Sequence, residues 1–143
     1  MYTKENLFDF AKNNIEVIFS KMGKKEQGGF LGCTAEVYTV LNRPNAEWTD
    51  EDGFDIIENG FKKEIKTCWT HSKQGYASWY NILSKRDKCD YFIFVDGLRN
   101  KVYEVPHDVV FYKMIVNTGS AKNGGYVKTT KHNMKILSRY LIK

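Results

Sequence analysis

The sequence predicts an α/β protein with a mixed central β-sheet flanked by helices. Two short strand-like runs surround Asn59-Gly60 within residues 54–67, and a nearly continuous apolar run at residues 90–95 has the length of a buried strand. Segments with helical spacing of apolar residues precede and follow these runs. Helices alternating with strands are typical of a sheet covered by helices.

The turn residues predict a tight hairpin. Asn-Gly suits a type I′ turn, which needs positive φ at both central positions. This turn places Glu64 opposite Asp55, and alternation along the strands sets Asp55, Glu64 and Lys66 on one face. The opposite, apolar face then consists of Phe54, Ile56, Phe61 and Ile65, with Glu58 and Lys63 as exceptions. Like charges directly across a hairpin are destabilising, and a divalent cation would compensate them.

The residues Asp55, Glu64 and Lys66, spaced as D-x8-E-I-K, resemble the signature of the PD-(D/E)xK nucleases, the restriction-endonuclease-like superfamily. Glu-x-Lys alone carries little information in a sequence rich in both residues. The motif becomes more specific because Asp55 lies in register with Glu64 across the turn. The resemblance implies a restriction-endonuclease-like core in which Asp55, Glu64 and the carbonyl of Ile65 bind Mg²⁺, with Mn²⁺ able to substitute. Lys66 would orient the attacking water. The alternative is a surface hairpin with solvated charges.

A helix predicted over residues 31–41 carries Glu36. The resemblance implies a supporting catalytic role for a Glu on a helix ahead of the hairpin, and a solvent-facing Glu36 is an equal alternative. The acidic connection at residues 45–53 supplies Asp52 as the second candidate should Asp55 not belong to the site.

The remaining elements are predicted from periodicity and turn signals. Residues 3–22 are expected to form one amphipathic helix, capped by Thr3 and stopped by Gly23, and its apolar stripe packs on the core or on a second copy. A helix is expected around residues 79–83, a strand at residues 101–105, and a short helix from Pro106 to about Met114.

The charge balance fits a nucleic-acid partner. The net charge is +5, and residues 117–143 carry six cations and no acid. This basic segment is expected to form part of the DNA-binding surface, together with side chains near the hairpin and the following loop. The candidate DNA contacts are Lys62, His71, Lys73, Gln74, Lys122, Asn123, Lys128 and Lys131.

Length and cysteine usage bound the class of protein. The 143 residues suit one domain, residues 1–143, that builds a core without staples. The odd number of cysteines, Cys33, Cys68 and Cys89, with no C-x2-C pair, predicts buried thiols in a reducing cytosol. The charged amino terminus lacks the apolar run of a signal peptide or membrane span, so a cytoplasmic protein without a membrane partner is expected.

These features together predict a Mg²⁺-dependent DNA endonuclease that resembles a type II restriction endonuclease and acts on duplex DNA as a homodimer. A structure-specific nuclease such as a Holliday junction resolvase is the first alternative. A non-catalytic DNA-binding module of the same fold is the second. The sequence has no P-loop or G-x-G-x-x-G motif, which argues against an enzyme of phosphate metabolites.

Overall fold

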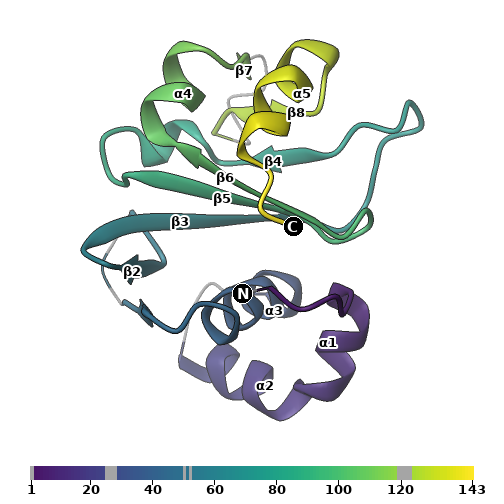
Figure 1. The fold of residues 1–143 in the computed structure, drawn as a ribbon, viewed down its shortest axis with the longest axis vertical. Coiled ribbons are helices and arrows are strands. Elements are labelled where there is room, and N and C mark those ends of the chain that lie inside the picture. The colour runs from purple at the N-terminus through teal and green to yellow at the C-terminus, as the bar shows by residue number, and fades with distance from the viewer. Residues whose placement is uncertain (1, 25–28, 50, 52, 119–123) are drawn as a thin grey trace.

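The computed structural model describes residues 2–24, 29–49, 51, 53–118 and 124–143. Its centre is a five-stranded sheet in the order β1-β2-β3-β5-β6 (Figure 1). The strands are β1 (Ala46–Trp48), β2 (Ile56–Glu58), β3 (Phe61–Cys68), β5 (Tyr91–Asp96) and β6 (Lys101–Pro106). β3 and β5 are parallel, while the other neighbours are antiparallel. The predicted mixed sheet, with its hairpin and buried strand, is therefore confirmed.

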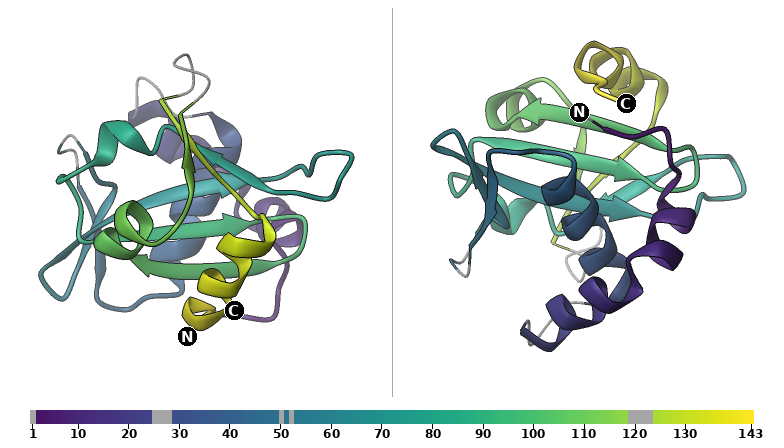
Figure 2. Two further views of the ribbon diagram at one scale, coloured as in Figure 1. Left: turned by 90° about the horizontal axis from the view of Figure 1, so that it is seen from above. Right: turned by 60° about the horizontal axis from the view of Figure 1, so that its bottom comes forward.

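Helices cover both faces of this sheet (Figures 1 and 2). On one face lie α1 (Leu7–Asn13), α2 (Ile15–Lys24) and α3 (Phe30–Leu41). On the other lie α4 (His107–Tyr112), α5 (Lys131–Leu137) and a small sheet of β4 (Ser78–Tyr80), β8 (Tyr126–Lys128) and β7 (Val116–Asn117). Two 3-10 helices, η1 (Leu83–Lys85) and η3 (Ser138–Tyr140), complete the described elements. Within these ranges, each helix is too short or too polar to cross a lipid bilayer.

Two apolar cores follow from the two covered faces. Ile56, Ile65 and Ile93 point toward α1–α3, whereas Phe92 and Phe94 belong to the core under the small sheet, α4 and α5. The sequence pattern predicts one apolar and one charged face for the hairpin. Because a second layer covers the charged face as well, its acidic residues lie in a partly dry environment.

The hairpin has the predicted register. Ile57 pairs with Lys62 and Glu58 with Phe61, and the turn residues Asn59 and Gly60 have φ of 52° and 84°. Positive φ at both central positions is the type I′ signature. The local turn chemistry therefore determines which residues of the two strands face each other.

The amino-terminal helix differs from its prediction. The chain forms α1 and α2 in place of a single helix, because Asn14 ends α1 with its backbone N–H and its side-chain amide both bonded to the Phe10 carbonyl. Asn6 caps α1 by accepting the Asp9 N–H at 2.8 Å, so Thr3 is not the cap. A polar side chain that competes for backbone groups is thus enough to interrupt the periodic pattern.

Two further corrections concern residues near the sheet. The segment at residues 79–83 is not a helix: β4 pairs with β8, and the buried Trp79 indole donates to the Val95 carbonyl at 3.0 Å. Phe54 lies in the core on the side of Phe92, not with Ile56 and Ile65, because β2 begins only at Ile56 and strand alternation does not extend back to residue 54. The helix predicted after Pro106 is confirmed as α4, with Pro106 in the N-cap position.

A buried ion network accommodates the two charged exceptions on the apolar face of the hairpin. Lys63 Nζ lies 2.6 Å from both Glu58 Oε1 and Glu104 Oε1. Arg43 Nη1 contacts the same two oxygens at 2.6 and 3.0 Å. Each cation therefore bridges two carboxylates, and the network ties the end of α3 to β2, β3 and β6. Buried charges are tolerated when they are paired and hydrogen-bonded in this way.

Candidate active site

The hairpin brings two carboxyl groups together beside the first half of β3. Asp55 directly precedes β2, its N–H donates to the Lys63 carbonyl at 2.9 Å, and its Oδ2 accepts the Ile65 N–H at 2.8 Å. Glu64 is 3% exposed and shares a hydrogen bond with Asp55. The predicted pairing of the two acids is therefore present, with Glu64 buried and Asp55 half-buried.

The surroundings of the pair favour the protonated form of Glu64. The pKa of the Glu64 carboxyl is raised from 4.5 to about 8, first by burial and then by the charge and the hydrogen bond of Asp55. The charges of two lysines act in the opposite direction. A carboxyl with a strongly perturbed pKa is typical of functional sites, since stability alone does not require one.

Those two lysines are Lys66 and Lys85, whose Nζ atoms lie 3.6 and 3.2 Å from Glu64 Oε2. Burial lowers the pKa of the Lys66 ammonium, which the Glu64 charge opposes and the Lys85 charge reinforces. Lys66 is a sequence-predicted site residue and stands where it was expected. Sequence reasoning missed Lys85, which is the last residue of η1 and part of a charged run that reads as a solvated helix end.

Cys89 lies near the same charges. The pKa of its thiol is raised to about 12, mainly by burial and then by the charge of Glu64. Only a thiolate is a good nucleophile, so Cys89 is a structural thiol at neutral pH. All three cysteines are free and buried, as the sequence predicts.

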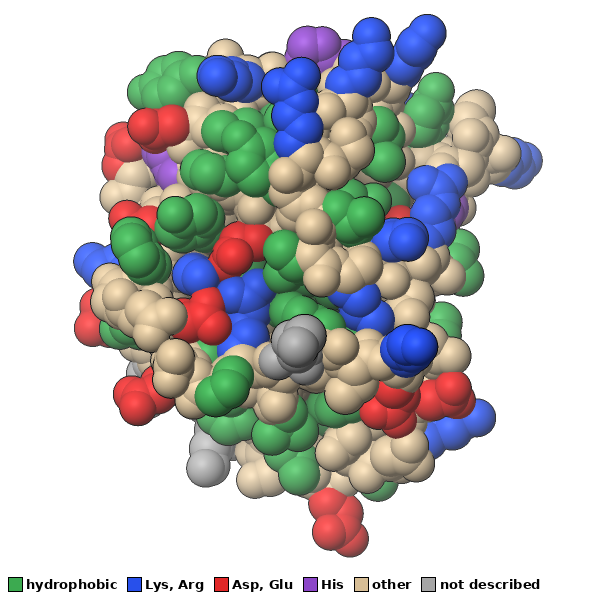
Figure 3. All heavy atoms as spheres, in the orientation of Figure 1, with side chains coloured by type: hydrophobic (Ala, Val, Ile, Leu, Met, Phe, Trp, Pro, Cys, Tyr) green, Lys and Arg blue, Asp and Glu red, His purple; other side chains and the backbone are tan. Residues whose placement is uncertain are grey.

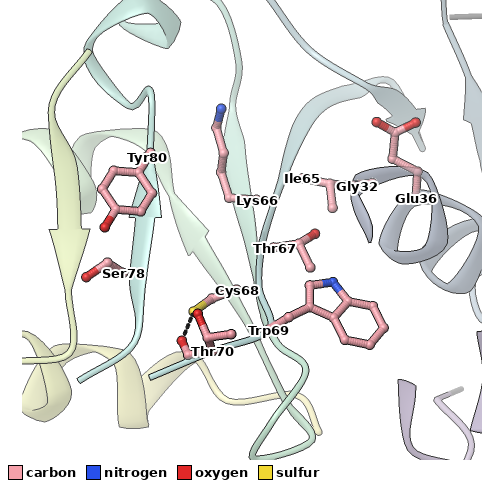
Figure 4. A pocket seen from close by; sticks show the side chains of 10 residues that line it. All are labelled: Gly32, Glu36, Ile65, Lys66, Thr67, Cys68, Trp69, Thr70, Ser78 and Tyr80. Carbon is pink, nitrogen blue, oxygen red and sulfur yellow. Dashed lines mark hydrogen bonds between the residues drawn. The ribbon is translucent and has the colours of Figure 1, made fainter. Parts of the chain in front are cut away.

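Glu36 and Lys66 line one cavity of about 320 Å³. Its remaining lining consists of Gly32 from α3, residues 65 and 67–70 at the edge of β3, and Ser78 and Tyr80 from β4. Figure 4 shows Glu36 on the α3 wall and Tyr80 on the β4 wall, with Lys66 between them. Glu36 is 7% exposed and lies 4.0 Å from Lys21 Nζ, so the alternative of a solvent-facing Glu36 is wrong.

The oxygen atoms of Asp55, Glu64 and Ile65 suit a hard cation. Asp55 and Glu64 contribute carboxylates, and the Ile65 carbonyl faces the same side as its N–H, which bonds Asp55. Among the described residues no group of three or more His, Cys, Asp or Glu side chains is placed to hold a metal. A site with two carboxylates and a carbonyl fits Mg²⁺, which usually keeps several waters in its coordination shell.

Of the residues near the hairpin that are predicted to contact DNA, some are exposed to solvent and one is not. Lys62 is exposed, with its Nζ 5.3 Å from the centre of the Phe54 ring. Lys73 and Gln74 are exposed on the loop between β3 and β4. His71 instead lies against the buried Asp96, with Nε2 2.9 Å from Oδ1, at the end of β5.

The carboxyl-terminal candidates lie on the layer of the small sheet and α5. Lys128 is half-buried with its Nζ 4.5 Å from the centre of the Tyr76 ring, and Lys131 is exposed at the start of α5. Lys and Arg side chains gather over this upper part of the molecule (Figure 3). Lys122 and Asn123 lie outside the described residues, as does Asp52, the second candidate for the acid before the hairpin.

Comparison with known proteins finds a likeness in structure and none in sequence. No family model matches the sequence, and no curated protein matches it. A bacterial homing endonuclease, I-Ssp6803I, has a similar structure, with a TM-score of 0.54 and 15% sequence identity over 73% of this chain and 78% of that one. At this identity the likeness shows the fold: a mixed sheet flanked by helices that a nuclease also uses.

Proposed function

We propose that the protein is a Mg²⁺-dependent DNA endonuclease of the PD-(D/E)xK type. The observation that carries the proposal is the hydrogen-bonded pair of the half-buried Asp55 and the buried Glu64, with Lys66 beside Glu64 and lining a cavity at the edge of β3. The shared fold supports the same proposal, since the protein of similar structure is named as an endonuclease, an enzyme that cleaves nucleic acid. Fold alone would not suffice, because one fold hosts many activities.

The residues divide into ligands and a positioning cation. Asp55, Glu64 and the Ile65 carbonyl would hold Mg²⁺, and Mn²⁺ is expected to replace it because both prefer oxygen ligands. When bound, the ion polarises the scissile phosphate and acidifies a water. Lys66 donates hydrogen bonds that orient the attacking water and offsets the charge that develops on the phosphate.

Two other side chains support this arrangement. Glu36, on the opposite wall of the cavity, would accept hydrogen bonds from water inside the cavity. Glu64 binds a cation only as a carboxylate, so its proton must leave first. Since its pKa is about 8, cleavage at fixed Mg²⁺ should increase as the pH rises toward that value.

DNA binding and assembly complete the proposal. The exposed cations Lys62, Lys73 and Lys131 would contact phosphates. Cutting both strands at related positions needs two sites related by two-fold symmetry, so we propose a homodimer. The exposed apolar side chains Phe8 and Phe19, at 47% and 56%, offer a contact surface on α1 and α2.

The decisive experiment incubates the protein with plasmid, linear duplex and four-way-junction DNA, with Mg²⁺ or with chelator, and sequences the product ends. We expect Mg²⁺-dependent cleavage that Glu64→Ala abolishes while DNA affinity is largely kept. Lys66→Met should also abolish cleavage, and Lys101→Met, at an exposed position of β6, is the matched control. Unchanged cleavage by Glu64→Ala would remove Glu64 from the site, and the substrate that is cut separates a restriction-like enzyme from a junction resolvase.

A further inference from the structure

The small sheet has one buried face and one face that is partly exposed to solvent. Trp79 and Val127 pair across β4 and β8 and are fully buried. Alternation therefore puts their neighbours on the other side. This outer face consists of Ser78, Tyr80, Asn117, Tyr126 and Lys128.

The outer face is aromatic and basic. Tyr80 is 50% exposed, and its ring centre lies 5.5 Å from that of Tyr126 at an interplanar angle of 42°. Lys128 Nζ lies over the ring of Tyr76 at 4.5 Å. The strands β4, β7 and β8 contain no acidic residue. This composition suits a partner that has flat rings and negative charge.

The outer face continues directly from the candidate active site. Ser78 and Tyr80 line the cavity that contains Lys66, and Figure 4 shows the Tyr80 ring beside the Lys66 side chain. The same two residues line a second cavity of about 230 Å³, together with His71, Ser72 and Tyr76. A chain that leaves the site near Lys66 therefore passes over Tyr80.

We infer that the outer face binds an unpaired segment of the DNA strand next to the bond that is cut, with bases stacked on Tyr80 and Tyr126 and a phosphate at Lys128. The inference rests on the proposed function, and it adds a substrate class to it. Phosphates gain nothing from the negative face of an aromatic ring, whereas an unstacked base gains a stacking partner. In an intact duplex the bases already stack on one another, so the face fits DNA with an unpaired segment beside the cutting position.

The test compares binding to three labelled oligonucleotides of one sequence by fluorescence anisotropy in chelator: a single strand, a duplex with a single-stranded tail, and a blunt duplex. Tyr80→Ala and Tyr126→Ala should each weaken binding to the tailed and single-stranded DNA by roughly 5- to 150-fold, the range expected for one lost stack. Binding to the blunt duplex should change less than twofold. Tyr80→Phe keeps the ring and should bind like the wild type.

Tyr112→Ala is the matched control, since Tyr112 is 74% exposed on α4, outside the outer face. Unchanged binding of tailed DNA by Tyr80→Ala, or an equal loss on the blunt duplex, would overturn the inference. Cleavage by the wild type with Mg²⁺ is measured in parallel. If the wild type does not cleave but the tyrosine variants lose binding to tailed DNA selectively, the outer face binds unpaired DNA and the nuclease proposal fails. If the wild type cleaves and the variants keep their binding, only the inference about the outer face is refuted.

Discussion

Replacing Glu64 by Gln should stabilise the metal-free protein at alkaline pH. Glu64 is 3% exposed and faces Asp55, so its ionised form is disfavoured in the folded state. A glutamine has nearly the same shape, cannot ionise, and can still donate a hydrogen bond to Asp55. The variant therefore avoids the cost of a second buried negative charge.

The size and sign of the effect follow from the pKa. The folded protein holds the Glu64 proton up to about pH 8, whereas the ordinary value is 4.5. Between these values the folded state binds more protons than the unfolded chain, so wild-type stability falls as the pH rises through this window. At about 1.4 kcal/mol per pH unit the loss is on the order of 5 kcal/mol. The pKa of about 8 already includes the attraction of Lys66 and Lys85 to the Glu64 carboxylate, so a gain of up to this size is expected above pH 8.

Urea unfolding in chelator at pH 5, 7 and 8.5, followed by tryptophan fluorescence, measures this gain. We expect almost no difference near the ordinary carboxyl pKa and a growing advantage of Glu64→Gln toward pH 8.5. Glu47→Gln, at an exposed position of β1, is the control and should behave like the wild type at each pH. A gain that does not depend on pH, or a less stable variant at pH 8.5, would refute the reasoning. Adding Mg²⁺ should stabilise the wild type and leave Glu64→Gln unchanged.

Three further predictions concern Lys85, which lies beside Glu64, and Gly32, which lines the cavity shared with Lys66. Lys85→Met removes a charge that lowers the pKa of Glu64, so the acidic limb of the pH–cleavage profile at saturating Mg²⁺ should move to higher pH. Lys85→Arg keeps the charge and should restore the wild-type profile. An unchanged profile in Lys85→Met would contradict a positioning role for Lys85. An added Cβ at Gly32 on α3 meets no atom within 4 Å, so Gly32→Ala should stabilise the fold by about 0.5–1 kcal/mol in thermal unfolding and leave cleavage intact. Gly32→Trp should fill the cavity and reduce cleavage without unfolding the protein, and full activity of that variant would place the substrate elsewhere.

The parts of the site that the sequence predicts are those fixed by local geometry. Asn59-Gly60 determines the turn, the turn determines the register, and the register brings Glu64 to Asp55. The pattern fails where alternation is extended beyond the strand, as at Phe54. It fails again where a polar residue such as Asn14 interrupts a periodic apolar stripe by bonding the backbone.

The rest of the site depends on contacts between distant segments. Lys85 lies 21 residues after Glu64 in the chain, and the loop after β3, then β4 and η1, must fold back before its Nζ reaches Oε2. No local signal in the charged run around Lys85 distinguishes a cation at the site from a solvated one. Tyr80 was expected within a helix, so its place on an open strand could not be read from periodicity either.

Two charge clusters on opposite faces of one hairpin support the proposed cation site at Asp55 and Glu64 when they are compared. In both, two carboxyl groups meet two cations. In the network of Glu58, Glu104, Arg43 and Lys63, each cation contacts both carboxylates within 3.0 Å. Although burial acts to raise it, the pKa of Glu58 is lowered by its hydrogen bond to Lys63 and by the charge of Arg43.

At the face with Asp55 and Glu64 the lysines stand farther from the carboxylate, and the pKa of the acid shifts in the opposite direction. Lys66 and Lys85 approach Glu64 only to 3.6 and 3.2 Å, the two carboxyl groups bond each other, and the pKa of Glu64 is raised. Burial acts to raise the pKa of both carboxyl groups, and it acts more strongly on Glu64, which is 3% exposed, than on the half-buried Glu58. The geometry of charge compensation adds to this difference, because both cations contact Glu58 within 2.6 Å, whereas the cations near Glu64 stand at 3.2 and 3.6 Å. An incomplete compensation that costs stability is expected where a divalent ion completes it during function.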